Sequence, residues 1–261
     1  MLKSIKALIN LLSGYKLIKS ISFSLFPSCC VLCGSESDRV IDLCYHCDSD
    51  LPHNNQCCVR CSIPLKINSI GFINNSQSGI LCGECTAHPP TFDQCLAPLR
   101  YEFPASSLIS RYKYQGHFCS GVILADILLT KIVKNQIRDQ NKKPDLIVPV
   151  PLHWQRQFFR GFNQSQWLAQ YLSRALKVPI NNRLLKRCRN TPPQQGLNRK
   201  QRQKNLKGAF RVNHPIEGKH IALVDDVVTT GSTVSELSKL LKKAGATKVE
   251  IWCLARTPLE K

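Results

Sequence analysis

The chain has 261 residues, which is enough for one full-size domain with its own core and a smaller module beside it. Its 36 Lys and Arg against 17 Asp and Glu give a formal charge of +19, which argues against cationic partners and favours nucleotides, nucleic acid or anionic lipid. The charge alone does not identify the partner, and many basic proteins bind only counterions from the solvent. No apolar stretch is long enough to span a bilayer.

Residues 1–27 have the pattern of an amphipathic helical extension. Leu2, Ile5, Leu8 and Leu12 recur at helical spacing, with lysines on the other face. These lysines interrupt any signal-peptide core and no small-residue cleavage site follows, so we expect the protein in the cytoplasm. The helix either packs on the body of the protein, which is the simpler reading, or binds a membrane surface.

Residues 28–90 are dense in cysteine and poor in periodic apolar positions, so they need help to form a core. Eight of the 14 cysteines form four CxxC pairs, in which one tight turn aims both sulfurs at the same ion. Four thiolates leave no open position, so structural zinc is expected, as one or two ions. The predicted ligands are Cys30, Cys33, Cys44, Cys47, Cys58, Cys61, Cys82 and Cys85.

Other uses of these cysteines stay open on the sequence. A disulfide framework, a redox CxxC pair and an iron–sulfur cluster all use the same residues. We expect the ligands to pair in chain order, although a crossed pairing uses the same eight residues. Gly34 and Gly83 are expected to help the chain turn beside the ligands.

From residue 91 the pattern is that of an α/β domain. The sequence predicts helices at residues 121–136, 167–176 and 233–244, and strands at residues 96–101, 145–151, 220–224 and 248–255. Short β-branched runs between helices are typical of buried parallel strands. We therefore predict a doubly wound, mainly parallel sheet over residues 91–261, after a small zinc-ribbon module at residues 28–90. The loops after Pro151 and Asp226 are the first places to expect a ligand.

Basic and aromatic side chains alternate in a short segment that ends at Gly116. Its residues are Arg111, Tyr112, Lys113 and Tyr114. This composition suits stacking on a base or on single-stranded DNA, but two of the four side chains can equally face the core, which is the simpler reading.

Two polar segments are candidates for binding a pyrophosphate. Arg160, Gly161 and Asn163 follow the predicted strand at residues 145–151, where a guanidinium and a flexible backbone can meet phosphate oxygens. The alternative is that Arg160 caps the next helix. Residues 183–211 are rich in Lys and Arg and contain no acid, which favours either a mobile loop over a phosphate or a strip that binds nucleic acid.

The sharpest pattern covers residues 221–233, an apolar strand that runs into Asp225 and Asp226 and then turns into a helix. A turn at a helix N-terminus aims N–H groups and hydroxyls inward, which suits a monophosphate. Adjacent carboxylates suit vicinal sugar hydroxyls and Mg²⁺, so the pattern predicts a ribose 5-phosphate site. The alternative is a solvated strand end and a plain helix cap. The residues of the turn are Thr229, Thr230, Gly231, Ser232 and Thr233.

These segments carry a resemblance to a known family. Residues 221–233 resemble the phosphoribosyl pyrophosphate signature of type I phosphoribosyltransferases, and the chain from Ser28 onward resembles the ComF family, including its ComFC or GntX form. The resemblance implies a phosphoribosyltransferase-type domain behind a double zinc ribbon. The other matching segments are VPVPL at 148–152, RGFNQS at 160–165, TPPQQGL at 191–197 and RQKNLKGAF at 202–210.

The resemblance also implies roles for single residues. The ligand would be phosphoribosyl pyrophosphate with Mg²⁺, and the basic segment would close over its pyrophosphate with Gln194, Arg202 and Asn205 at the patterned positions. A nitrogenous acceptor would then take the ribosyl carbon, but no general base for it is identifiable. The resemblance equally implies a non-catalytic accessory protein of natural competence, which binds nucleotide and single-stranded DNA and meets other proteins of the competence machinery.

Overall fold

The structure is a computed structural model, and it describes residues 29–37, 39, 41–65, 79–138, 143–152, 161–189, 206 and 208–258. The helix predicted in residues 1–27 and most of the basic segment lie outside these residues. Among the helices that are described, none is both long and apolar enough to cross a membrane.

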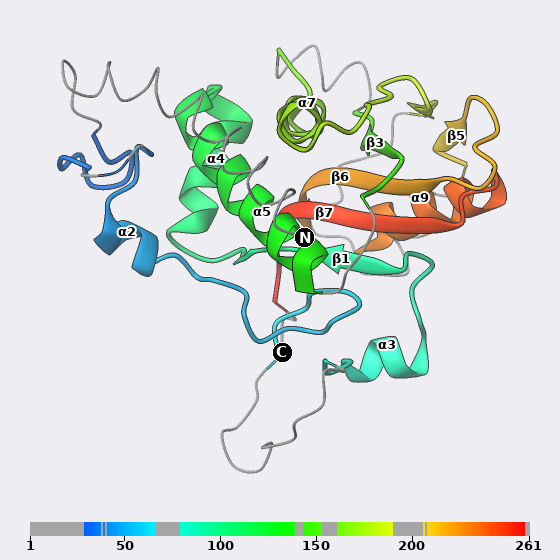
Figure 1. The fold of residues 1–261 in the computed structure, drawn as a ribbon, viewed down its shortest axis with the longest axis horizontal. Helices are drawn as coiled ribbons and strands as arrows, with labels where there is room; N and C mark the ends of the chain where they lie inside the picture. The colour runs from blue at the N-terminus through cyan, green and yellow to red at the C-terminus, as the bar shows by residue number, and fades with distance from the viewer. Residues whose placement is uncertain are drawn as a thin grey trace.

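A five-stranded parallel sheet forms the centre of the described structure (Figure 1). The central strand β7 is buried at every position after its first, as expected for a parallel strand that is covered on both faces. The neighbouring strands are, in order, β1 (Gln94–Leu96), β7 (Lys248–Arg256), β6 (His220–Val228) and β3 (Leu146–Pro149), with β2 (Leu99–Arg100) also paired to β7.

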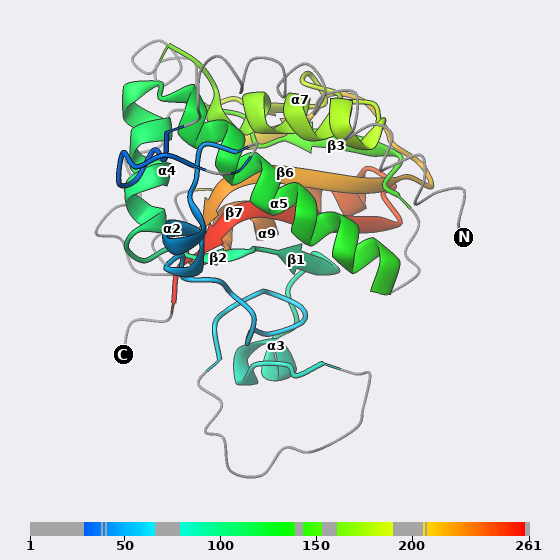
Figure 2. The same cartoon turned by 60° about the vertical axis from the view of Figure 1, so that its left-hand side comes forward.

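Helices cover both faces of this sheet (Figure 2). The division follows from the alternation of side chains along β6: Ala222 and Val224 pack on one side, Ile221 and Leu223 on the other. This arrangement confirms the predicted doubly wound α/β fold. One face carries α4 (Ala105–Gln115), α5 (Phe118–Arg138) and α7 (Gln164–Leu176), and the other carries α9 (Ser232–Lys243) and the antiparallel pair β4 (Leu185–Arg187) and β5 (Phe210–Val212).

The strands depart from the prediction at two places. The strand predicted at residues 96–101 is two short strands, because Pro98 between them has no N–H for the ladder. Strand β6 continues past residue 224, because Val227 and Val228 pair with Ala255 and Arg256 of β7. Asp225 and Asp226 therefore lie within the strand, and the turn begins after Val228.

The cysteine-rich segment contains the same turn twice. The N–H of Gly34 donates to the carbonyl of Cys30 at 2.8 Å, and the N–H of Ser62 donates to that of Cys58 at 2.9 Å. Gly34 and Ser62 both have positive φ, 77° and 53°. Gly83 does not turn the chain as predicted, because it is the first residue of helix α3 (Gly83–Ala87), so Ser62 takes the turning position at the second repeat. The predicted domain boundaries stay a prediction.

Candidate functional site

The CxxC cysteines form two four-thiol clusters, paired in chain order. Four sulfurs that each lie about 2.3 Å from one zinc ion are about 3.8 Å from one another. The sulfurs of Cys33 and Cys44 are 3.8 Å apart, and those of Cys61 and Cys82 are 3.7 Å apart, so both clusters fit a tetrahedral ion. The first cluster is Cys30, Cys33, Cys44 and Cys47, and the second is Cys58, Cys61, Cys82 and Cys85.

Backbone N–H groups favour the thiolate form that binds zinc. Cys44 and Cys82 cap the helices α2 (Tyr45–Ser49) and α3, and each sulfur accepts the N–H of the cysteine three residues later at 3.4 Å. The pKa of Cys58 is lowered to about 4, first by a hydrogen bond from the Cys61 thiol and then by backbone N–H groups, which together outweigh its burial. Within the second cluster the thiolate form is therefore favoured at Cys58, whereas the pKa values of Cys61 and Cys85 are raised.

The two clusters pack against opposite faces of the sheet. Cys30 belongs to the apolar core that α4, α5 and α7 form, and Arg111 of α4 donates to the carbonyl of Val31 at 2.9 Å. Cys58 belongs to the core on the α9 side. The cysteine-rich segment thus reaches both layers that cover the sheet.

The loop at residues 229–233, called here the β6–α9 loop, lies at the carboxyl end of β6. Gly231 has a φ of 79°, a conformation that other residues rarely adopt, and as the N-cap of α9 it has no side chain to cap the first-turn N–H groups. A helix N-terminus of this kind favours an anion. The pocket here is lined by Asp225, Val227, Val228, Thr229, Thr230, Gly231, Ser232, Thr233 and Val234.

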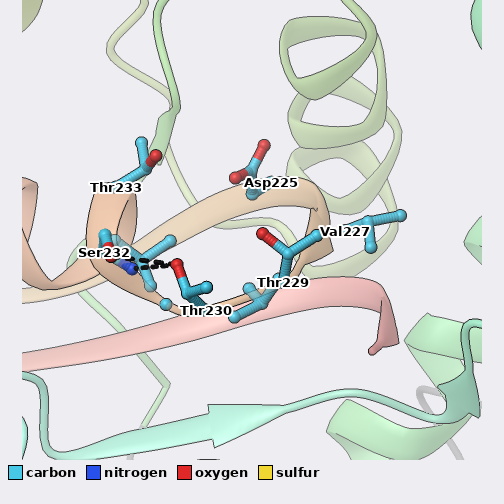
Figure 3. A pocket seen from close by; sticks show the side chains of 9 residues that line it. Asp225, Val227, Thr229, Thr230, Ser232 and Thr233 are labelled. Atoms are coloured by element: carbon cyan, nitrogen blue, oxygen red, sulfur yellow. Dashed lines mark hydrogen bonds between the residues drawn. The ribbon is translucent and has the colours of Figure 1, made fainter. Parts of the chain in front are cut away.

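Hydroxyl groups surround this pocket (Figure 3). The hydroxyls of Thr230 and Ser232 are 2.9 Å apart and hydrogen-bonded. The side chains of Asp225 and Thr233 rise from the chain on the same side of the loop. The pocket therefore combines a carboxylate with hydroxyl donors and a helix N-terminus.

The two adjacent carboxylates have different surroundings. Asp225 lines the pocket, and its Oδ1 accepts hydrogen bonds from the Ser165 hydroxyl at 3.1 Å and from the Asp226 N–H at 2.9 Å. Asp226 does not line the pocket; its Oδ2 lies 3.1 Å from Nζ of Lys113, and both side chains are about four-fifths or more buried, at 16% and 14% exposure. Only Asp225 is thus placed directly at the pocket.

Lys113 and Ser165 were not predicted as site residues. Tyr112 faces the core, as the simpler interpretation of its segment predicts: it is buried, and its hydroxyl donates to the carbonyl of Gln164 at 2.7 Å. Tyr114 is exposed. Lys113 lies between them on α4 and faces the acids. The signal for it is weak, since a lysine between two aromatic residues does not show which face it takes.

Burial and charge shift the pKa values of this group. Burial first, and then the charge of Asp226, raise the pKa of Asp225 to about 7, although the Asp226 N–H, the charge of Lys113 and the Ser165 hydroxyl act to lower it. Burial alone would lower the pKa of Lys113, but the charge and hydrogen bond of Asp226 and the charge of Asp225 together hold it above its ordinary value. The carboxyl group of Asp225 therefore has a pKa near neutral pH.

A test on protein stability follows from the raised pKa of Asp225. Between its ordinary value of 3.8 and about 7, the folded state holds a proton that the unfolded chain has lost, so stability at this group falls as pH rises. Relative to Asp225→Asn, wild type should lose about 1–3 kcal/mol of unfolding free energy between pH 5 and pH 8. Urea unfolding of both proteins at the two pH values measures this, and parallel pH profiles would contradict it.

The remaining predicted residues divide into described and undescribed ones. Asn163 is the N-cap of α7: its Oδ1 accepts the N–H of Gln166 and its Nδ2 donates to the carbonyl of Val150, both at 3.3 Å. Gly161 is exposed, with a φ of 76°. Ligand contacts of these two stay a prediction. Arg160, Gln194 and Arg202 lie outside the described residues.

Two family models match parts of the chain. A phosphoribosyl transferase domain matches residues 160–260, which include the β6–α9 loop and both acids. A double zinc ribbon domain matches residues 21–86, which include all eight cysteines of the two clusters.

Relatives match most of the chain. Competence protein F of Haemophilus influenzae is 38% identical over 222 residues, which cover 82% of this chain and 96% of the relative. The chain belongs to the ComF family. Another ComF relative, the DNA utilization protein YhgH of Escherichia coli K12, is 36% identical over 215 residues, covering 82% of this chain and 90% of the relative. Competence protein ComFC of Bacillus subtilis is 24% identical over 254 residues, covering 87% and 95%.

This ComF chain therefore joins a phosphoribosyltransferase-type domain to a double zinc ribbon. Its two four-thiol clusters are structural zinc sites, because four cysteines occupy every tetrahedral position. Zinc there crosslinks segments that are separate in the sequence.

Proposed function

We propose that this protein binds phosphoribosyl pyrophosphate with Mg²⁺ in the pocket of the β6–α9 loop. The observation that carries the proposal is the meeting of a helix N-terminus whose N-cap residue Gly231 has no side chain, several hydroxyls and the carboxylate of Asp225 in one pocket. N–H groups and hydroxyls are donors for the 5-phosphate. A carboxylate accepts hydrogen bonds from the ribose hydroxyls or binds the water shell of Mg²⁺.

Asp226 joins the ligand in this proposal only when its ion pair with Lys113 opens. The two groups lie 3.1 Å apart, so Lys113 holds the position beside Asp226 that a metal cation would need. Mg²⁺ carries twice the charge of Lys113 and prefers oxygen ligands, so the bound ion replaces Lys113 as the partner of Asp226. Lys113 is then free to meet a phosphate oxygen.

The pyrophosphate end of the ligand is assigned to the other polar segments. Arg160, Gly161 and Asn163 follow β3 in the chain, and the last residue of β3, Pro149, pairs with Val224, the residue before Asp225. Gln194 and Arg202 belong to the basic segment. Cations at this end neutralise the charge of a departing pyrophosphate.

As an enzyme, the protein would transfer the phosphoribosyl group to a nitrogenous acceptor. The bond between the ribosyl C1 and pyrophosphate breaks, the pyrophosphate leaves with that electron pair, and the acceptor nitrogen forms the new bond to C1. The residues of the pocket bind the parts of the ligand that do not react, and so hold C1 in place.

Calorimetry with a panel of sugar phosphates tests the proposal. We expect Mg²⁺ with phosphoribosyl pyrophosphate to bind most tightly, ribose 5-phosphate more weakly, and 2-deoxyribose 5-phosphate about tenfold more weakly than ribose 5-phosphate, because it lacks one hydroxyl for the carboxylate. Absence of binding by phosphoribosyl pyrophosphate with Mg²⁺ would overturn the proposal. Equal binding of ribose 5-phosphate and 2-deoxyribose 5-phosphate would show that Asp225 does not accept a hydrogen bond from the ribose 2-hydroxyl.

A second candidate is a nucleic-acid-binding accessory function without turnover. It is favoured by the formal charge of +19 and by relatives that are named for competence and DNA utilization. In this case the sugar-phosphate pocket senses a ligand, and single-stranded DNA and competence proteins are the partners. Release of pyrophosphate, assayed against a panel of bases with and without single-stranded DNA, separates the two candidates.

A further inference from the structure

Arg256, the last residue of β7, connects the β6–α9 loop to the second cluster. Its side chain is buried, at 5% exposure. The Nε donates to the carbonyl of Cys61 at 3.1 Å, while Nη1 donates to the carbonyl of Val228 at 2.9 Å and also to that of Thr229. One rigid guanidinium thus bonds to a zinc-binding turn on one side and to the start of the loop on the other.

These bonds orient the peptide groups of the loop. In a trans peptide the C=O and the following N–H point in opposite directions. Because Arg256 draws the carbonyls of Val228 and Thr229 toward itself, the N–H groups of Thr229 and Thr230 point away from it. The Thr257 N–H also donates to the Val228 carbonyl, at 3.1 Å, so Arg256 and the backbone of β7 together fix which face of the loop presents its donors.

The zinc-binding turn is itself fixed to the sheet. The hydroxyl of Ser62 donates to the carbonyl of Cys95 at 2.6 Å, and the N–H of Cys95 donates to the carbonyl of Arg60 at 2.8 Å. Cys61 lies between these two contacts and contributes its sulfur to the second cluster. A zinc ion in this cluster therefore holds the peptide whose carbonyl Arg256 uses.

The charge of Arg256 adds a second reason for a link to the ligand. A guanidinium keeps its charge at every accessible pH. Its hydrogen-bond acceptors in the described part of the chain are all backbone carbonyls, those of Cys61, Val228, Thr229 and Thr257. A buried cation favours negative charge nearby, so an anion held in the adjacent loop would interact favourably with it.

We infer that Arg256 is a positioning residue through which the second cluster, and not the first, sets the shape and the phosphate affinity of the β6–α9 loop. The affinity part rests on the proposed function, whereas the shape part does not. The first cluster packs on the opposite face of the sheet, among α4 and α5, and serves as the internal comparison.

Three arginine variants test the role of the side chain. Arg256→Gln removes the charge and the planar set of N–H donors. Arg256→Lys keeps the charge, but one ammonium group cannot donate to the Cys61 and Val228 carbonyls at the same time. Arg100→Lys is the matched control. Arg100 lies on β2, directly opposite Arg256 of β7, but its side chain forms an ion pair with Glu102 at 3.1 Å. We expect amide exchange of residues 228–234 without ligand to be about tenfold faster in both Arg256 variants and unchanged in Arg100→Lys.

Double-mutant cycles separate coupling from general loss of stability. Cys85→Ser, in the second cluster, should accelerate exchange in the loop of wild type but add little in Arg256→Gln, because the link is already broken. Cys47→Ser, in the first cluster, should combine additively with Arg256→Gln. If Arg256→Gln does not fold, the same cycles are run with Arg256→Lys.

Calorimetry with Mg²⁺ and phosphoribosyl pyrophosphate completes the test. We expect affinity to fall about tenfold in Arg256→Lys, further in Arg256→Gln, and not in Arg100→Lys. Unchanged exchange in the Arg256 variants, or additive cycles for both clusters, would overturn the inference. If wild type binds no phosphoribosyl pyrophosphate, the proposed function fails, and the exchange cycles still decide whether Arg256 couples the cluster to the loop.

Discussion

Replacement of both Asp225 and Asp226 by asparagine should weaken the binding of Mg²⁺ with phosphoribosyl pyrophosphate by about 100-fold or more. Each carboxylate is expected to contribute about 1.5 kcal/mol or more through charge-assisted hydrogen bonds, and about 1.4 kcal/mol corresponds to tenfold in affinity. Asparagine keeps the size of the side chain but removes the charge that Mg²⁺ requires. Calorimetry measures the loss.

The single variants should differ in stability. Asp225→Asn removes a carboxyl group whose pKa is raised, so it should stabilise the fold above pH 7. The same change should weaken ligand binding. Asp226→Asn leaves the buried Lys113 without its partner at 3.1 Å, so it should lower the unfolding temperature. This opposite behaviour distinguishes loss of the site from general damage to the protein.

Asp145→Asn is the matched control for the acidic pair. Asp145 accepts the N–H of His220 at 2.8 Å, at the other end of β6. Its replacement should leave ligand affinity within about twofold of wild type. If the double variant binds as tightly as Asp145→Asn, the two acids do not form the ligand site.

Removal of zinc from the second cluster should destabilise the protein more than removal from the first. Structural zinc contributes about 10–16 kcal/mol in small zinc domains, which is comparable to the entire stability of a folded domain. Cys58 is fully buried in the core against the sheet, whereas Cys33 is exposed. We expect Cys58→Ser to lower the unfolding temperature by about 10 °C or more, and Cys33→Ser to lower it less.

Elemental analysis and circular dichroism check this result. Wild type should contain two zinc ions per chain, and each variant should contain about one, if the clusters are independent. Cys119→Ser is the control, since Cys119 is exposed and outside both clusters. Wild-type protein purified without zinc, or an unfolding temperature of Cys58→Ser equal to that of Cys119→Ser, would contradict the assignment.

Local patterns in the sequence were sufficient for helices α5, α7 and α9, for strands β3 and β7, and for the zinc ligands. The apolar patterns of strand β7 and helix α9 are formed by residues that are close in the sequence, and a CxxC pair places both sulfurs in one turn. These features therefore do not depend on distant parts of the chain. The pattern around Gly231 predicts the loop for the same reason. The pairing of the clusters remained open, because four CxxC units can be combined in more than one way.

Contacts between distant residues needed the fold. The pair of Lys113 and Asp226, the bond from Ser165 to Asp225 and the bridge from Arg256 to Cys61 each join segments that only the packing of the sheet and helices brings together. A lysine in α4 or an arginine at the end of β7 has no periodic signature of its partner, because side-chain direction depends on which face packs. The zinc-binding segments and the β6–α9 loop were therefore readable along the chain, whereas the groups that set the charge and orientation of the loop were decided by three-dimensional packing.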